Sequence, residues 1–204
     1  MLAAKLKTQV RREQIAWAAL RLVAGGGLKR LSMAAIARQV GFGPTAVYRH
    51  FKSKDEVLDA ALALVGTKLQ ENVKAVHAEA EDPLERLRRL LARHIALIRD
   101  NDAIPRVVFS EDFYAGHPER KLRMYRGIQM YLKQVAQIIR QGQASGQVET
   151  DFDAEDAAVM FLGLVQPSAI LWHMSDGEFD VTRTAERTWR LFLKAIQKTQ
   201  ATKG

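Results

Sequence analysis

The strongest constraint on the fold lies in residues 31–51, LSMAAIARQVGFGPTAVYRHF, which predict two short helices joined by a tight turn. Ser32 can cap the first helix, because its hydroxyl accepts a hydrogen bond from an amide left unpaired at the helix start. Gly41 can end that helix, since glycine adopts the left-handed conformation without steric cost. Pro44 can open the second helix, where its missing N–H is not needed. Two helices meeting at such a turn form a helix-turn-helix.

The positive charge of the chain is concentrated on this same region. Residues 1–54 contain 11 Lys and Arg against one acid, Glu13, a net charge of +10. Residues 55–204 contain 20 Lys and Arg against 22 Asp and Glu, a net charge of −2. A basic run is often only a solvated face. Because the whole excess lies on the segment with the helix-turn-helix, a polyanionic partner is the better interpretation.

The run from Ala19 to Leu58 resembles the DNA-binding domain of TetR-family transcriptional repressors, most closely in TAVYRHF at 45–51 and KSKD at 52–55. The resemblance implies a double-stranded DNA operator, with the tyrosine and histidine facing DNA and the lysine that opens the next helix holding a phosphate. The candidate DNA contacts are Ser32, Ala34, Gly43, Pro44, Thr45, Tyr48, Arg49, His50 and Lys54.

Two of these positions depart from the family pattern. Gly43 replaces the usual capping hydroxyl, which removes one possible phosphate contact. Ala34 occupies a site where some relatives have a long basic side chain. Base reading is therefore expected to depend more on Thr45 and Arg49.

The rest of the chain shows helical periodicity and no convincing strand. We expect an all-α fold of about nine helices, with an N-terminal three-helix helix-turn-helix domain at 9–54 and a C-terminal bundle at 55–200. In the family, the C-terminal region is a ligand-binding and dimerisation domain. The first helix is expected from Val10, after a frayed tail. Residues 104–114 and 153–174 are each predicted as one helical segment, the second bent by Pro167.

Several function classes are excluded by what the sequence lacks. There are no cysteines, so disulfides, thiolate chemistry and Cys-ligated zinc are ruled out. The five histidines are scattered and form no metal-binding or catalytic pattern. We therefore expect no enzyme activity, no cofactor and no metal. No uninterrupted apolar run of about 18 residues or signal peptide is visible, which favours a cytoplasmic protein without a membrane partner.

The segment 153–174 is apolar nearly all round, more than one bundle can cover. A second apolar stripe lies on the last helix. We expect the last two helices to pair with those of a second copy in a two-fold homodimer. The predicted interface residues are Ala157, Phe161, Leu164, Trp189, Phe192 and Ile196.

The C-terminal segments also hold many aromatic and methionine side chains. Such residues are more often plain core, but they also line apolar cavities in helix bundles. The candidate pocket residues are His94, Phe109, Phe113, Tyr125, Phe161, Trp172 and His173. They predict a small hydrophobic or aromatic ligand that releases a repressor from DNA. The alternative is a DNA-bound adaptor that responds to a protein partner and has no small-molecule inducer.

Overall fold

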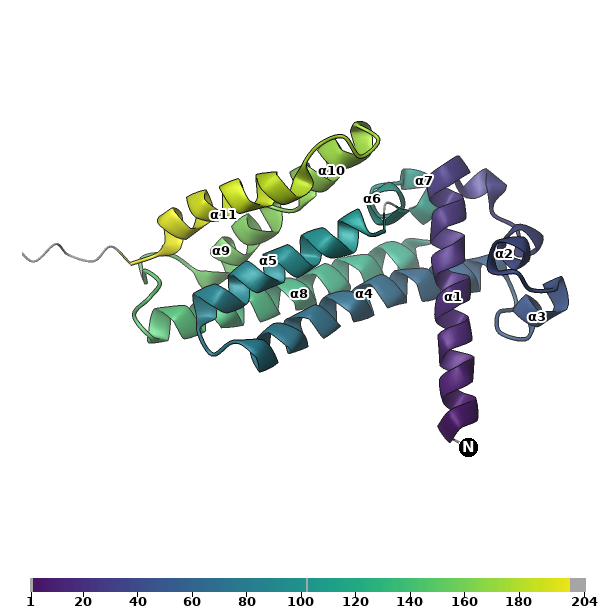
Figure 1. The fold of residues 1–204 in the computed structure, drawn as a ribbon, viewed down its shortest axis with the longest axis horizontal. Coiled ribbons are helices and arrows are strands. Elements are labelled where there is room, and N and C mark those ends of the chain that lie inside the picture. Colours follow the sequence, from purple (N-terminus) through teal and green to yellow (C-terminus); the bar gives the residue numbers. More distant parts are fainter. Residues whose placement is uncertain (1, 102, 199–204) are drawn as a thin grey trace, which may run out of the picture. The chain divides into compact units, whose positions relative to one another are not determined.

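The computed structural model of the chain describes residues 2–101 and 103–198, with the side chains of residues 2–7 and 44 outside that description. Within these ranges the regular structure is helical, and the only β-type pairing is an isolated antiparallel bridge between Val148 and Gln197. The all-α prediction is confirmed. The helices run from α1 (Leu2–Gly26) to α11 (Val181–Ile196), as Figure 1 shows.

Three segments differ from the sequence-based expectation. Helix α1 begins at Leu2 and not near Val10, so the predicted tail is helical. Residues 104–114 form two helices, α6 (Ala103–Val108) and α7 (Glu111–Tyr114). Residues 153–174 also form two, α9 (Ala154–Gly163) and α10 (Gln166–Met174), because Pro167 lies in the first turn of a new helix instead of bending a continuous one. These two breaks raise the number of helices above the nine expected.

The chain forms two compact units that no single cut in the sequence separates. The first unit comprises Met1–Lys68 and Asn101–Met124, and the second comprises Leu69–Asp100 and Tyr125–Gly204. Two long helices, α4 (Lys54–Glu79) and α8 (Pro118–Ala144), each contribute residues to both units. The first unit therefore contains α6, α7 and the start of α8 in addition to the helix-turn-helix segment.

In the first unit, α1 packs against α2 (Met33–Val40) on one side and against α6 on another. The short 3₁₀ helix Leu28–Arg30 connects α1 to α2. The Nη1 of Arg106, on α6, donates a hydrogen bond of 2.5 Å to the carbonyl oxygen of Ala24 near the end of α1. This bond satisfies one of the carbonyls that a helix leaves unpaired at its C-terminus. The core of the unit includes Ile15, Ala19, Ile36, Val47, Phe51 and Leu58.

A buried arginine joins the start of α8 to the start of α4 within the same unit. Arg120 is only 1% exposed, and its guanidinium donates to Asp59 Oδ1 at 2.9 Å, Asp55 Oδ1 at 3.3 Å and the carbonyl oxygen of Phe113 at 2.9 Å. It also lies 4.9 Å from the centroid of the Phe113 ring. Arg123 donates to Asp59 as well, at 2.5 Å. A buried cation needs such partners, since desolvation without them is costly.

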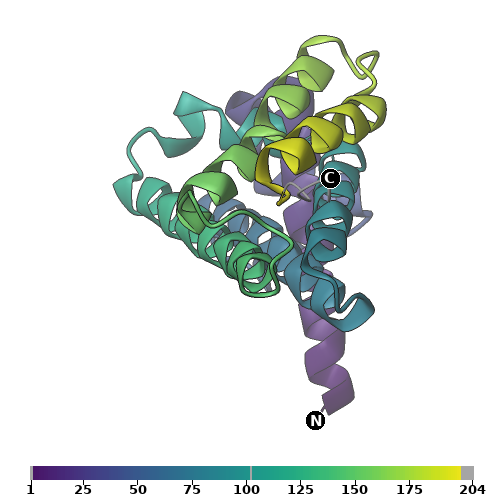
Figure 2. The same cartoon turned by 90° about the vertical axis from the view of Figure 1, so that its left-hand side faces the viewer.

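The second unit is a bundle in which α11 packs against α5 (Pro83–Arg99), α9 and α10 (Figure 2). The Phe161 and Phe192 rings meet at its centre, with centroids 5.8 Å apart. The bridge between Val148 and Gln197 ties the loop after α8 to the end of α11. The core is apolar and includes Leu87, Leu90, Leu91, Ile95, Val135, Ile139, Phe161, Trp189 and Phe192.

Candidate functional site

The helix-turn-helix has the local geometry that its sequence predicts. The Ser32 hydroxyl accepts a hydrogen bond of 3.1 Å from the amide of Ala35 at the start of α2. Gly41 ends α2 in the left-handed conformation, with φ of 71°. Gly43 precedes α3 (Pro44–Tyr48) without a side-chain cap. Helix α3 is five residues long and ends at Tyr48, before His50.

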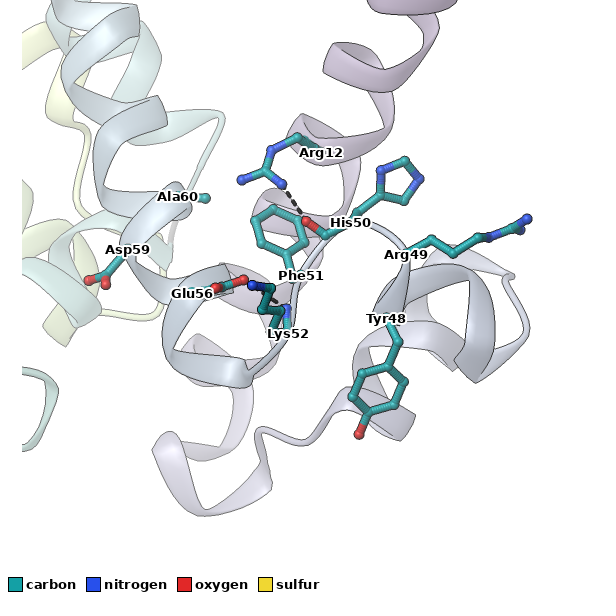
Figure 3. A pocket seen from close by; sticks show the side chains of 9 residues that line it. All are labelled: Arg12, Tyr48, Arg49, His50, Phe51, Lys52, Glu56, Asp59 and Ala60. Carbon is teal, nitrogen blue, oxygen red and sulfur yellow. Dashed lines mark hydrogen bonds between the residues drawn. The ribbon is translucent and has the colours of Figure 1, made fainter.

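Most of the candidate DNA contacts lie on the exposed surface of the first unit. Ser32, Ala34, Gly43, Thr45, Tyr48, Arg49 and Lys54 are exposed, whereas His50 is half-buried. The side chain of Pro44 lies outside the described residues. Tyr48 and Arg49 point away from the body of the unit (Figure 3). Because the buried side of α3 is formed by Val47, its exposed side is free to approach another molecule.

The protonation of His50 is controlled by its surroundings. Burial lowers the pKa of His50, and the positive charges of Arg12, Arg49 and Arg11 lower it further. A neutral imidazole offers one donor and one acceptor, whereas the imidazolium offers two donors. The neutral form is therefore the one that faces a partner near pH 7.

A cavity of about 490 Å³ lies beside α3 and is built from residues of α1, the loop after α3 and α4. Figure 3 shows the Glu56 carboxylate turned toward the Lys52 backbone, whose amide donates to Glu56 Oε2 at 2.7 Å. Sequence reasoning did not name Arg12, Lys52 or Glu56 as site residues. The signal for Arg12 was present in the basic excess of residues 1–54. The lining is Arg12, Tyr48, Arg49, His50, Phe51, Lys52, Glu56, Asp59 and Ala60.

The predicted ligand-pocket residues belong to both units. Phe109 and Phe113 belong to the first unit, where Phe113 is fully buried against Arg120 and Phe109 is 49% exposed. The other candidates belong to the second unit. Tyr125 is 59% exposed, Phe161 is in the core, and Trp172 and His173 are half-buried. Helical spacing identified apolar positions, but it did not distinguish an inward face from an outward one.

His94 instead belongs to a polar pair inside the second unit. Its Nδ1 lies 3.1 Å from the Tyr131 hydroxyl, and the two rings meet edge to face with centroids 5.4 Å apart. Burial lowers the pKa of His94 to about 4 and raises the pKa of Tyr131. One turn further along α8, the buried Oε1 of Gln134 has no hydrogen-bond partner among the described residues.

Also among the described residues, no cluster of three His, Cys, Asp or Glu could hold a metal ion.

Five of the six predicted dimer-interface residues are already buried within one chain, namely Ala157, Phe161, Trp189, Phe192 and Ile196, and Leu164 is half-buried. Within one chain these side chains therefore have little free area to offer a partner, and their assignment to the interface stays a prediction. The exposed apolar residues of the same helices are Val159, Met160, Ile170, Leu171, Met174 and Leu191. The stretch Ala154–Met174 could also span a membrane by length and composition alone, and 33% of its apolar window is buried.

Comparisons with known proteins cover both parts of the chain. Residues 15–61 match the family profile described as bacterial regulatory proteins, tetR family. Residues 80–196, more than half of the chain, match the profile of the tetracyclin repressor-like C-terminal domain.

Individual relatives align over nearly their whole length. The nucleoid occlusion factor SlmA of Vibrio vulnificus strain YJ016 is 26% identical over 192 residues, which cover 94% of this chain and 98% of that protein. The fatty acid degradation regulator FadR from Bacillus halodurans has a similar structure, with a TM-score of 0.77, 22% identity, and coverage of 90% of this chain and 94% of that one. FadR from Bacillus subtilis in complex with stearoyl-CoA gives a TM-score of 0.74 at 20% identity, covering 90% and 98%.

The buried His94 makes the stability of the protein depend on pH. The unfolded chain binds a proton at His94 below its ordinary pKa of 6.5, whereas the folded protein does not do so until about pH 4. The free energy of unfolding should therefore fall as pH drops through this window, by about 2 kcal/mol between pH 7 and pH 5. Urea unfolding at the two pH values measures the change. His94→Gln, which does not titrate, should lose about 2 kcal/mol less, and an equal loss in both proteins would contradict the assignment.

Proposed function

Because this chain belongs to the TetR family of DNA-binding transcriptional regulators, we propose that it is a ligand-responsive repressor. It binds a near-palindromic operator as a homodimer in the cytoplasm and is released by a small hydrophobic or aromatic effector. Residues 9–54 form the DNA-binding segment, and residues 55–200 form the ligand-binding and dimerisation segment. No catalytic activity, cofactor or membrane partner is part of this proposal.

The exposed side of the helix-turn-helix carries the DNA-binding part of the proposal. We assign α3 to the major groove, where Thr45 and Arg49 read base edges while Tyr48 and the neutral His50 contact the operator beside them. Lys54, exposed at the start of α4, contacts a phosphate. The remaining proposed DNA contacts are Ser32, Ala34, Gly43 and Pro44. The Ser32 hydroxyl is already used as a helix cap, so its contact with DNA is expected to be secondary.

Two substitutions separate base reading from phosphate contact. Arg49→Ala should cost about 1–3 kcal/mol on the preferred site and relax the preference at one base pair, because a base contact is lost. Lys54→Ala should weaken binding to all sequences alike and reduce the salt slope by about one, because one phosphate contact is lost. Anisotropy titrations at several salt concentrations, on a site obtained by unbiased selection, measure both. An Arg49→Ala protein with unchanged affinity and preference would remove Arg49 from the site.

The dimer is proposed on the exposed apolar surface of α9, α10 and α11. Leu191 is 67% exposed and Met174 is 75% exposed, which leaves apolar area that a second copy can cover. A two-fold homodimer contains two α3 helices, one for each half-site of a near-palindrome. The buried residues predicted from sequence lie beneath this surface and do not contact the partner.

Sedimentation at micromolar concentration tests the dimer. The wild-type protein should sediment as a dimer, and Leu171→Glu should shift it toward the monomer, because a carboxylate would be buried in an apolar interface. Met130→Glu is the matched control, since Met130 is an exposed apolar residue on α8 and is not part of the proposed surface on α9, α10 and α11. A monomeric wild-type protein, or equal effects of the two substitutions, would exclude this surface.

The effector is proposed to enter the apolar interior of the second unit. The pair formed by His94 and Tyr131 supplies polar groups in an otherwise apolar core and can orient one end of a ligand. Few charged groups are buried there, so a mostly apolar compound fits better than a multiply charged one. The structural relative from Bacillus subtilis was solved with stearoyl-CoA, which supports an acyl chain as the part of the ligand that enters this apolar interior.

A thermal-shift screen of fatty acyl-CoA esters, free fatty acids, steroids and aromatic compounds tests the effector. Compounds that raise the melting temperature should also weaken operator binding. By linkage, a ligand that weakens DNA binding tenfold binds about 1.4 kcal/mol less tightly to the DNA-bound protein. His94→Gln should reduce the response to ligands oriented by this pair.

The alternative is a DNA-bound adaptor that responds to a protein partner. Its support is the similarity to SlmA over nearly the full length of both chains. If every stabilising compound leaves operator affinity unchanged, the adaptor function replaces the ligand-responsive repressor as the proposal.

A further inference from the structure

Helix α3 is too short to maintain its own orientation. It has five residues, about one and a half turns, and isolated helices of that length are unstable in water. Its direction must therefore be set by packing, through Val47 in the core and at its two ends. Two aromatic residues flank it, Phe42 before it and Phe51 after it.

Arg12, on α1, holds the C-terminal side of α3. Its guanidinium lies 4.0 Å from the centroid of the Phe51 ring, which is buried beneath it. Its Nη1 also donates a hydrogen bond to the carbonyl oxygen of His50, drawn as a dashed line in Figure 3. The carbonyls that follow a helix have no partner in the next turn, so this bond satisfies an otherwise open acceptor.

Arg11 makes a matching contact on the other side. Its guanidinium lies 4.6 Å from the centroid of the Phe42 ring, and its Nη1 donates to Gln14 Oε1 at 3.0 Å. Two consecutive residues of α1 therefore contact the two aromatic residues between which α3 is placed. Arginine suits this role because its planar guanidinium stacks on a ring and donates hydrogen bonds at the same time.

We infer, on the premise of the DNA-binding function proposed above, that Arg12 is a positioning residue for base reading, assisted by Arg11. The two form an arginine clamp (Arg11 and Arg12 with Phe42 and Phe51). The clamp sets the angle at which Thr45, Tyr48 and Arg49 face the major groove. Arg12 acts on specificity through α3 and not by adding a phosphate contact.

The test compares Arg12→Lys with Arg21→Lys, a control at an exposed position on the same helix. Lysine retains the charge but loses the planar stack and the forked donors. Arg12→Lys should weaken binding to the selected operator on the order of tenfold. Binding to unrelated DNA and the salt slope should stay unchanged, so the specificity ratio falls. Arg21→Lys should leave all of these unchanged.

A second variant tests the clamp without changing any charge. Phe51→Leu removes the aromatic face and keeps an apolar side chain in the core. It should reduce the specificity ratio in the same way, and the double variant with Arg12→Lys should lose less than the two single losses combined. Fully additive losses would show that the two residues act independently and would overturn the inference.

Hydrogen exchange tests whether the arginine clamp holds α3, and it does so without DNA. In Arg12→Lys, the amides of residues 46–51 should exchange about tenfold faster, while the amides in the core of α1 keep their protection. Unchanged exchange at 46–51 overturns the inference. An equal loss on operator and unrelated DNA also overturns it, because that result indicates a direct contact between Arg12 and the DNA backbone. If the wild-type protein prefers no DNA sequence, the proposed function fails, and the exchange result still decides whether the clamp exists.

Discussion

The buried guanidinium of Arg120 imposes the constraint on which the first unit depends. A cation that is 1% exposed needs its partners, and they are two carboxylates in the first turns of α4 and a carbonyl at α7. Those turns begin at Lys54, the proposed phosphate contact. The start of α4 is therefore held from the start of α8, and both helices continue into the second unit. A change in the course of either helix therefore acts on these ion pairs, which lie next to Lys54.

The parts of the fold that sequence predicts best are those encoded locally. The Ser32 cap, the left-handed Gly41 and the start of α3 at Pro44 each depend on one residue and its neighbours, and all three occur as expected. The predicted dimer residues are a different case. An apolar stripe predicts burial, and Trp189 and Phe192 are buried, but the pattern does not tell a core within one chain from an interface between two.

The contacts that sequence did not predict join residues far apart in the chain. Arg12 meets the carbonyl of residue 50, and His94 meets Tyr131, 37 residues later. Each pair joins two polar groups in a place that only the tertiary fold creates. Such pairs leave no periodic signal, because each partner alone resembles an ordinary helix residue. The structure thus adds to the predicted helix-turn-helix the side chains that orient it.

The bond from Arg106 to Ala24 has a consequence for how this protein can be divided. Helix α1 supports the helix-turn-helix, yet its last turn is capped by a side chain 82 residues further along, on a helix packed against it. A fragment that stops at residue 54 loses both the cap and the apolar cover of α6. The segment proposed to read DNA therefore depends on α6 for part of its packing. A chimaera that exchanges this segment with that of a relative should carry α6 with it, because the two segments are structurally one piece although the sequence separates them.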